Sequence, residues 1–236
     1  MGTSKDFPGS TGGGWTGFKR AASRLAREGA GDRRNVAAVV ARNAEALGGA
    51  AAAAAAATAG RRSAAQVGRL LTGIGTGGGG FTPTLVELGL AEFIGSSPLD
   101  LVNALSDAIA GDGATLEENA AREAVIFVLI QLFGEAQTYE DLEALALDEA
   151  GVRDAFANFI ARYVYQRLLP MLDQRLNQRG DPAATHQSER AVWEYTLELA
   201  RLDLADTDVS GLDWSGPEAD AIAGDLISGV YRVFGE

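Results

Sequence analysis

The sequence predicts an all-α protein, a multi-helix bundle with a flexible, glycine-rich N-terminal leader, and three observations indicate this fold class. Apolar residues recur at helical spacing along most of the chain beyond residue 80. Helix start signals such as Thr115-Leu116-Glu117-Glu118 precede these stretches. No run of alternating β-branched residues predicts a strand, so we expect six or seven helices packed on one another.

The first 80 residues differ in composition from the rest and divide into three predicted segments. Residues 1–17 are rich in Gly, Ser and Thr and hold too few apolar groups to offset the entropy of ordering, so we expect a flexible leader. Residues 18–72 form a basic segment rich in alanine and arginine, and the glycine-rich residues 73–80 are expected to be a linker. The expected helices of the basic segment cover residues 18–27, 33–47 and 62–71.

Residues 81–236 are predicted to form an acidic helical bundle. Pro83 and Pro98 suit first-turn positions of helices, and Pro170 is expected to kink or split the longest one. The clearest expected helices cover residues 115–133, a short stretch from 138, 151–178, 188–204 and 217–234. The apolar stretch 125–133 is too short to cross a membrane, and we expect it to be a buried helix segment.

Charge is distributed unevenly along the chain. Residues 1–70 hold 11 Lys or Arg against 4 Asp or Glu, whereas the remaining residues hold 9 against 28. We therefore expect the basic N-terminal region to contact something acidic, and the acidic bundle to repel nucleic acid, so that direct nucleic-acid binding is not predicted.

The composition also excludes several classes of protein. The chain has no cysteine, which excludes disulfides, thiolate zinc sites and thiol nucleophiles. It has no apolar signal-peptide core and no stretch long enough to span a membrane, so we expect a cytoplasmic protein. No pattern predicts catalytic residues, a metal site or a cofactor, and the protein is not expected to be an enzyme.

Two loop motifs resemble ligand sites in part. Residues 73–78 match the glycine pattern of dinucleotide-binding loops, but no strand precedes them and no Lys-Ser or Lys-Thr follows, so a linker is the better interpretation. Residues 206–211 resemble the first half of a calcium-binding loop. The position of the bidentate glutamate holds Pro217, with Glu218 one residue late, which favours a solvated turn with aspartate caps over a calcium site.

Other polar groups have structural explanations. His186, the single histidine, is expected in a surface connector between residues 181 and 188, and Ser188 beside it carries no nucleophile motif. Glu117 and Glu118 are adjacent carboxylates that point in different directions on a helix, and we expect them to be solvated, first-turn charges.

Aromatic residues gather near the C-terminus. Trp193 shares a predicted helix face with Leu197 and Ala200, while Trp214 lies in an acidic turn. Core packing explains them best, and a groove for a partner helix is the alternative.

The N-terminus has a distinct chemistry. Methionine is removed when the second residue is small, so Gly2 is expected to present a free, unhindered amine on a long arm. The myristoylation pattern asks for Ser or Thr where the chain has Asp6, so lipidation is not predicted.

Several motifs together resemble a known family. Met1-Gly2-Thr3-Ser4, followed by an aromatic residue and Pro8-Gly9, resembles the B component (QatB-like) of the Qat anti-phage defence system. In the bundle, the residues that carry the likeness are Leu105-Ser106-Asp107-Ala108-Ile109, Gly113, Glu117-Glu118 and Arg122-Glu123-Ala124. The leader is short here and lacks the proline-rich spacer common in the family.

The resemblance implies a function and partners. The partners would be a 7-cyano-7-deazaguanine synthase-like (QatC-type) protein, an ATPase and a TatD-like nuclease. Gly2 would be recognised, and modified, by the synthase-like partner, with Thr3 and Ser4 as recognition residues. The alternative is a structural adaptor that bridges the ATPase and the nuclease without any modification of the N-terminus.

Overall fold

The long helix α9 (Glu149–Asn177) is the centre of the fold, because helices from both halves of the chain pack around it. A computed structural model describes residues 13–178 and 181–234, and this part of the chain contains eleven α-helices, two 3₁₀ helices and one isolated β-bridge. Phe156, Phe159, Tyr163 and Leu168 of α9 are fully buried. The structure confirms the all-α class, with more helices than the six or seven expected.

The other elements follow in chain order as α1 (Gly13–Glu28), α2 (Arg33–Ala46), α3 (Ala50–Ala55), α4 (Thr58–Ile74), α5 (Phe81–Glu87), η1 (Ala91–Phe93), α6 (Pro98–Ala110), α7 (Leu116–Phe133), α8 (Tyr139–Glu143), α10 (Pro182–Asp203), η2 (Val209–Gly211) and α11 (Ala219–Val233).

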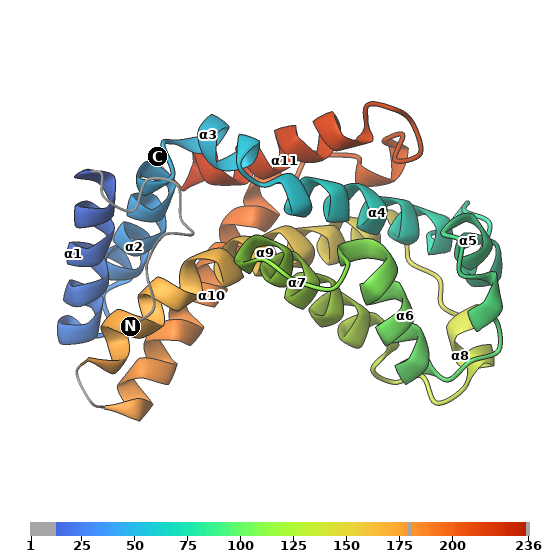
Figure 1. The fold of residues 1–236 in the computed structure, drawn as a ribbon, viewed down its shortest axis with the longest axis horizontal. Helices are drawn as coiled ribbons and strands as arrows, with labels where there is room; N and C mark the ends of the chain where they lie inside the picture. Colours follow the sequence, from blue (N-terminus) through green and yellow to red (C-terminus); the bar gives the residue numbers. More distant parts are fainter. Residues whose placement is uncertain (1–12, 179–180, 235–236) are drawn as a thin grey trace.

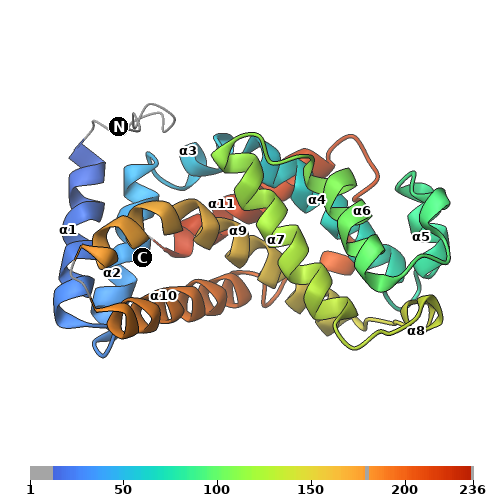
Figure 2. The ribbon, with the colours of Figure 1, turned by 60° about the horizontal axis from the view of Figure 1, so that its bottom comes forward.

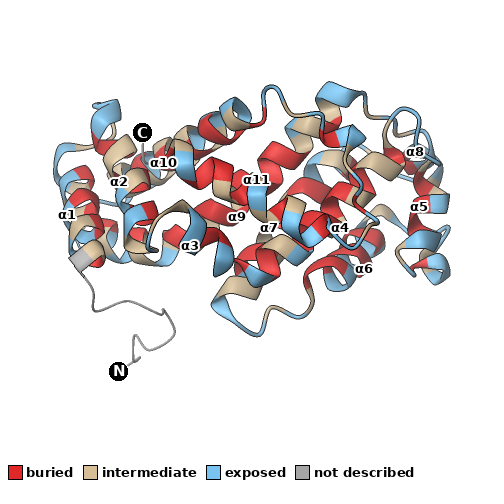
Figure 3. Cartoon of the chain, turned by 90° about the horizontal axis from the view of Figure 1, so that it is seen from above, coloured by how far each residue is buried: buried red, intermediate tan, exposed pale blue. Residues whose placement is uncertain are grey.

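The helices form an elongated arch (Figure 1). The pair α1 and α2 lies at one end, and α5, α6 and α8 lie at the other. Both α7 and α10 pack along α9 (Figure 2), while α4 and α11 contact each other. Buried residues concentrate along α4, α9 and α11, and exposed residues are common around α5 and α8 (Figure 3). The core therefore runs along the arch rather than through a single central point.

Most helices begin where a local side chain accepts an amide hydrogen bond. Thr115 and Thr138 form complete capping boxes with Glu118 and Asp141, as the sequence predicts for Thr115. Ser97 caps α6, which carries Pro98 at its first position. Such caps satisfy amide groups that have no partner within the helix, and they explain why local sequence fixes these boundaries.

The structure corrects three boundaries expected from the sequence. Residues 13–17, expected within the flexible leader, belong to α1, where Trp15 is buried and packs edge-on against Phe18 with ring centroids 6.0 Å apart. Residues 50–55, six consecutive alanines between the expected helices 33–47 and 62–71, form an additional helix, α3. α9 continues through Pro170 as one helix, so the split that was one of the two expected outcomes does not occur.

The glycine-rich residues 73–80 make specific main-chain contacts in the structure. The amide of Thr76 donates to the carbonyl of Leu147 at 2.7 Å, and Gly75 forms a parallel β-bridge with the same residue. A side chain at Gly78 would lie 2.3 Å from the carbonyl oxygen of Gly73, so the turn requires glycine there. The division of the chain at these residues stays a prediction.

The apolar stretch 125–133 lies within α7, and Val125, Val128, Leu129 and Phe133 are buried. This agrees with its interpretation as a buried helix segment. Across the described ranges, no helix combines the length and the apolar character needed to cross a bilayer.

Two glycines of α4 allow aromatic rings to approach the helix backbone. A Cβ atom at Gly60 would lie 2.2 Å from the Tyr163 ring, and one at Gly68 would lie 2.3 Å from the Trp214 ring. Trp214 also stacks at a tilt on Phe156, with centroids 5.0 Å apart, and its indole donates to the Val209 carbonyl at 2.9 Å. These rings join α4 and the C-terminal turn to α9.

The substitution Gly60→Ala is expected to destabilise the fold by about 3 kcal/mol, because the new methyl group overlaps the buried Tyr163 ring. Chemical denaturation followed by far-UV circular dichroism measures the change. The control is Gly17→Ala in α1, where the nearest atom is the end of the flexible Arg42 side chain at 3.3 Å, and a gain of up to about 1 kcal/mol is expected. Equal stabilities of Gly60→Ala and the parent protein would contradict the close approach.

Candidate functional site

The predicted recognition residues Gly2, Thr3 and Ser4 lie outside the described residues, so their roles stay predictions. The structure does describe the helix that follows them. α1 packs on α2, α9 and α10, and Gly14 lies so close to α2 that a Cβ atom there would be 2.9 Å from the Ala46 Cα. The chain that precedes Gly13 is thus joined to a firmly packed helix at one end of the arch.

A second candidate site is centred on Glu117, in the first turn of α7. Its carboxylate accepts the amides of Ala59 at 2.9 Å and Gly60 at 2.8 Å, and the hydroxyl of Tyr163 donates to it at 2.5 Å. The residue before α4 is Ala57, which has no side chain able to cap the helix. Glu117 therefore supplies, from α7, the cap that α4 lacks, and the positive end of the α4 dipole stabilises its charge.

Arg167 of α9 lies beside this cap. Its guanidinium donates to the carbonyl of Ala53 in α3 at 3.2 Å and to the Tyr231 hydroxyl at 3.4 Å. Burial lowers the pKa of Arg167, but the phenol oxygens of Tyr231 and Tyr163 and the Glu117 carboxylate outweigh it, and the net shift is upward. The corner between α3 and α4 is thus held by a cation on its carbonyl side and an anion on its amide side.

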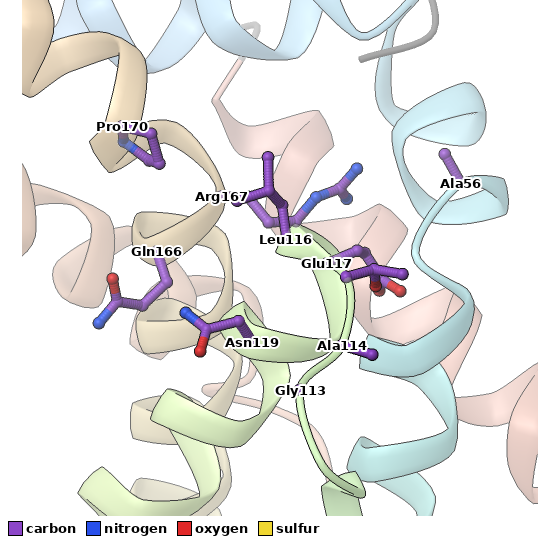
Figure 4. A pocket seen from close by; sticks show the side chains of 10 residues that line it. Ala56, Gly113, Ala114, Leu116, Glu117, Asn119, Gln166, Arg167 and Pro170 are labelled. Atoms are coloured by element: carbon purple, nitrogen blue, oxygen red, sulfur yellow. The ribbon is translucent and has the colours of Figure 1, made fainter. Parts of the chain in front are cut away.

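A pocket of about 760 Å³ opens at this corner (Figure 4). Its apolar walls include Ala56, Leu116 and Pro170, and its polar groups come from Thr115, Glu117, Asn119, Gln166 and Arg167. The volume is in the range of small-molecule sites. Glu117, however, already accepts three hydrogen bonds from the protein, and Arg167 already donates to α3. The charged groups of the pocket therefore have a structural role, because they hold the corner between α3 and α4. We call Glu117 with its three hydrogen-bond donors the Glu117 clamp.

The sequence predicts Glu117 to be a solvated, first-turn charge. Its place in the first turn of α7 is confirmed, but its solvated state is wrong, because the carboxylate is bonded to α4 and α9. Glu118 does cap its own helix, with the Thr115 amide donating to it at 3.0 Å. Glu117 instead reaches an amide pair 57 and 58 residues away in the chain. Local sequence reveals the first contact because both partners lie in one motif. It cannot reveal the second, whose partners are main-chain amides without a side-chain signature.

The other polar motifs singled out in the sequence are part of helices and turns. His186, expected in a connector, lies exposed within α10, and Ser188, which is buried, follows it on the same helix. Two residues apart on a helix, they are rotated by about 200° and do not form a base and nucleophile pair. Asp208 and Asp213 accept amides of their own turns, from Gly211 at 2.9 Å and Ser215 at 3.0 Å. Over the residues that the structure describes, no group of three or more acidic or histidine side chains is arranged to hold a metal ion.

Trp193 packs as core residues do. Its ring meets Phe127 at 5.3 Å and Tyr165 at 5.8 Å, both edge-on. The Arg162 guanidinium lies 4.9 Å from the Phe127 centroid and 5.6 Å from that of Trp193. This aromatic cluster joins α7, α9 and α10, in agreement with the packing interpretation.

The substitution Glu117→Gln is expected to cost about 2 kcal/mol of folding stability, because one amide oxygen must serve three donors and the new NH₂ group faces other donors. Thermal and urea unfolding measure it. Glu118→Gln is the matched control, since glutamine also completes a capping box, and it should be nearly neutral. Equal effects of the two substitutions would contradict the clamp.

Stability is expected to fall as the pH rises from about 10 to about 12. Burial raises the pKa of Tyr165 to about 12 and that of Tyr163 well above its usual range. In the unfolded chain a tyrosine loses its proton near pH 10, so the stabilisation is complete below that pH and is lost as the pH approaches the folded values. Urea unfolding at a series of alkaline pH values tests this, and Tyr165→Phe should flatten the decline. A stability that stays constant up to pH 12 would show that these phenols are not buried.

Comparison with known proteins gives one match. A family model described as "QatB: Qat anti-phage system associated protein QatB" matches residues 48–234. No curated protein and no solved structure matches the chain. The matched region extends from the turn before α3 to the end of α11, and so includes the Glu117 clamp and the pocket but not α1. Since the match covers most of the 236 residues, the chain belongs to the QatB family of the Qat anti-phage defence system.

Proposed function

We propose that this chain is a non-catalytic component of the Qat system whose Gly2 amine is recognised and covalently modified by a 7-cyano-7-deazaguanine synthase-like (QatC-type) partner. The observation that carries the proposal is the sequence Met1-Gly2-Thr3-Ser4 ahead of a packed helix. Membership of the family supports a role in defence, and the resemblance of the leader supports the role of Gly2.

The chemistry of an N-terminal glycine suits this role. An α-amino group has a pKa near 8, so roughly a tenth of it is free amine at pH 7, whereas a lysine with a pKa near 10.4 is almost wholly protonated. The amine nitrogen would attack an activated carboxyl carbon of a deazaguanine, lose a proton and form an amide, and the activating group would leave. Gly2 has no side chain to obstruct this attack, and Lys5 nearby is the less reactive competitor.

The leader is long enough to enter a partner's active site. Residues 2–12 can span at most about 36–40 Å when fully extended, measured from the start of α1 at Gly13. The small side chains of Thr3 and Ser4 would pass through a narrow channel, and their hydroxyls can hydrogen-bond to its wall. The helical part of the chain would stay outside and dock on the partner's surface.

Co-expression with an active QatC-type partner is expected to add one small group to the N-terminal peptide, read by intact mass and by peptide fragmentation. Gly2→Leu should abolish the addition, since a bulky second residue retains Met1. Gly2→Ala, which allows removal of Met1 but hinders the amine, should reduce it. Gly9→Leu is the matched control and should be modified normally.

Two results would contradict the proposal. The first is an N-terminal peptide of unaltered mass beside an active partner, which favours an adaptor that bridges the ATPase and the nuclease. The second is an added group on Lys5 in place of Gly2.

A further inference from the structure

Charge is separated between the two ends of the arch. Residues 81–110 and 139–143, which form α5, η1, α6 and α8, hold seven Asp or Glu and no Lys or Arg. Residues 13–46, which form α1 and α2, hold seven Lys or Arg against three acidic residues. These helix groups lie at opposite ends of the molecule (Figure 1). The pair α1 and α2, which we call the basic end, is therefore positively charged, and the opposite end is acidic. The helix α10 packs on the basic end and holds four acidic residues against two arginines.

The basic end presents an unpaired helix face. Lys19, Arg20 and Arg24 of α1 are exposed, and none of them forms an ion pair with a residue in the described ranges. Arg20 and Arg24 are one helical turn apart, so their side chains extend from the same side of α1. We call these three residues the basic stripe. Within the described ranges, no acidic side chain forms an ion pair with the stripe.

The acidic end exposes apolar side chains as well as carboxylates. Val86, Ile94 and Leu99 are 53%, 42% and 70% exposed, and all three lie in the short segment from α5 to the start of α6. Glu92 and Glu140 are exposed at this end and form no ion pair with a described residue. Because α5, η1 and α6 lie at the same end of the arch, these exposed apolar side chains can add apolar contact to an interface there. We call this surface the acidic tip.

The two surfaces suit each other chemically. Arginine and lysine cover apolar surface with their methylene stems while their charged heads reach nearby carboxylates. The stems of the basic stripe would cover Val86, Ile94 and Leu99, and the charged heads would meet Glu92 and Glu140. Isolated surface ion pairs contribute little, so the apolar contact is needed as well.

We propose that the basic stripe of one copy docks on the acidic tip of a second copy, so that the chains associate head to tail. Because the two surfaces differ, each docked copy leaves one basic stripe and one acidic tip free, and the contact can repeat into a ring or an open filament. The net charge of −12 opposes association. Charges more than roughly 14 Å apart are already screened at about 0.05 M salt, however, and the local contact then dominates.

Nucleic acid is the less suitable occupant of the stripe. Phosphates of a duplex extend well beyond three side chains and would reach the acidic helix α10, which packs on α1. An acidic protein surface of limited area can cover the stripe alone, and this chain itself carries one at its far end.

Sedimentation velocity over a range of protein concentrations, in low and high salt, tests the proposal. The parent chain should self-associate in about 0.05 M salt and dissociate at about 0.5 M. Arg20→Glu/Arg24→Glu should weaken association about tenfold or more at low salt. Arg62→Glu/Arg232→Glu changes the net charge equally, at exposed positions outside α1, and should leave association nearly unchanged.

A charge exchange makes the test specific. Glu92→Arg/Glu140→Arg should also lose self-association, and an equimolar mixture with Arg20→Glu/Arg24→Glu should associate again, because the reversed stripe meets the reversed tip. Leu99→Ser should weaken association at low salt without changing the net charge, because it removes apolar contact. Circular dichroism confirms that each variant is folded, as expected for changes at exposed positions.

Three results would overturn the proposal. They are a monomeric parent chain at all concentrations in low salt, a mixture of the two reversed variants that fails to associate, and a stripe that binds a short DNA duplex without self-association. The experiment uses the chain alone, so its outcome is independent of Gly2 modification.

Discussion

The fold depends on a single carboxylate that joins three helices. α4 begins among alanines and has no polar residue able to accept its first amides, so its start requires an acceptor from elsewhere. Glu117 provides it from α7, and the Tyr163 hydroxyl of α9 donates to the same carboxylate. Gly60 is needed in turn, because a side chain there would occupy the place of the Tyr163 ring. An alanine-rich corner with little area to bury is thereby fixed by polar contacts.

The sequence predicts the parts of this fold that local chemistry decides. The capping box at Thr115 and the apolar face of α9 are visible in the sequence because their determinants lie within one helix. The sequence places Trp15 in a flexible leader, because its glycine-rich neighbours give no sign that α2, α9 and α10 provide a surface on which α1 packs. The solvated state predicted for Glu117 is wrong for the same reason. Contacts between distant segments carry no local pattern, and the structure is needed to find them.

The charged and aromatic residues at the centre of the arch hold its helices together. Glu117 and Arg167 are committed to helix ends, and Trp193 and Trp214 are committed to ring contacts with α7 and α9. The basic stripe at one end, and Val86, Ile94 and Leu99 at the other, remain exposed. A protein that contacts other chains needs accessible groups of this kind, and the packed helices between the two ends hold them apart.

Helix α1 joins the two proposals physically. It is the attachment point of the leader that carries Gly2, and it also carries the basic stripe. If copies associate through α1, each leader emerges beside an interface, and a partner that takes Gly2 must approach where the next copy docks. Assembly and modification would then compete for space or proceed in a fixed order. Because the buried Trp15 and Phe18 hold α1 against the rest of the chain, neither process can displace the helix without exposing apolar surface.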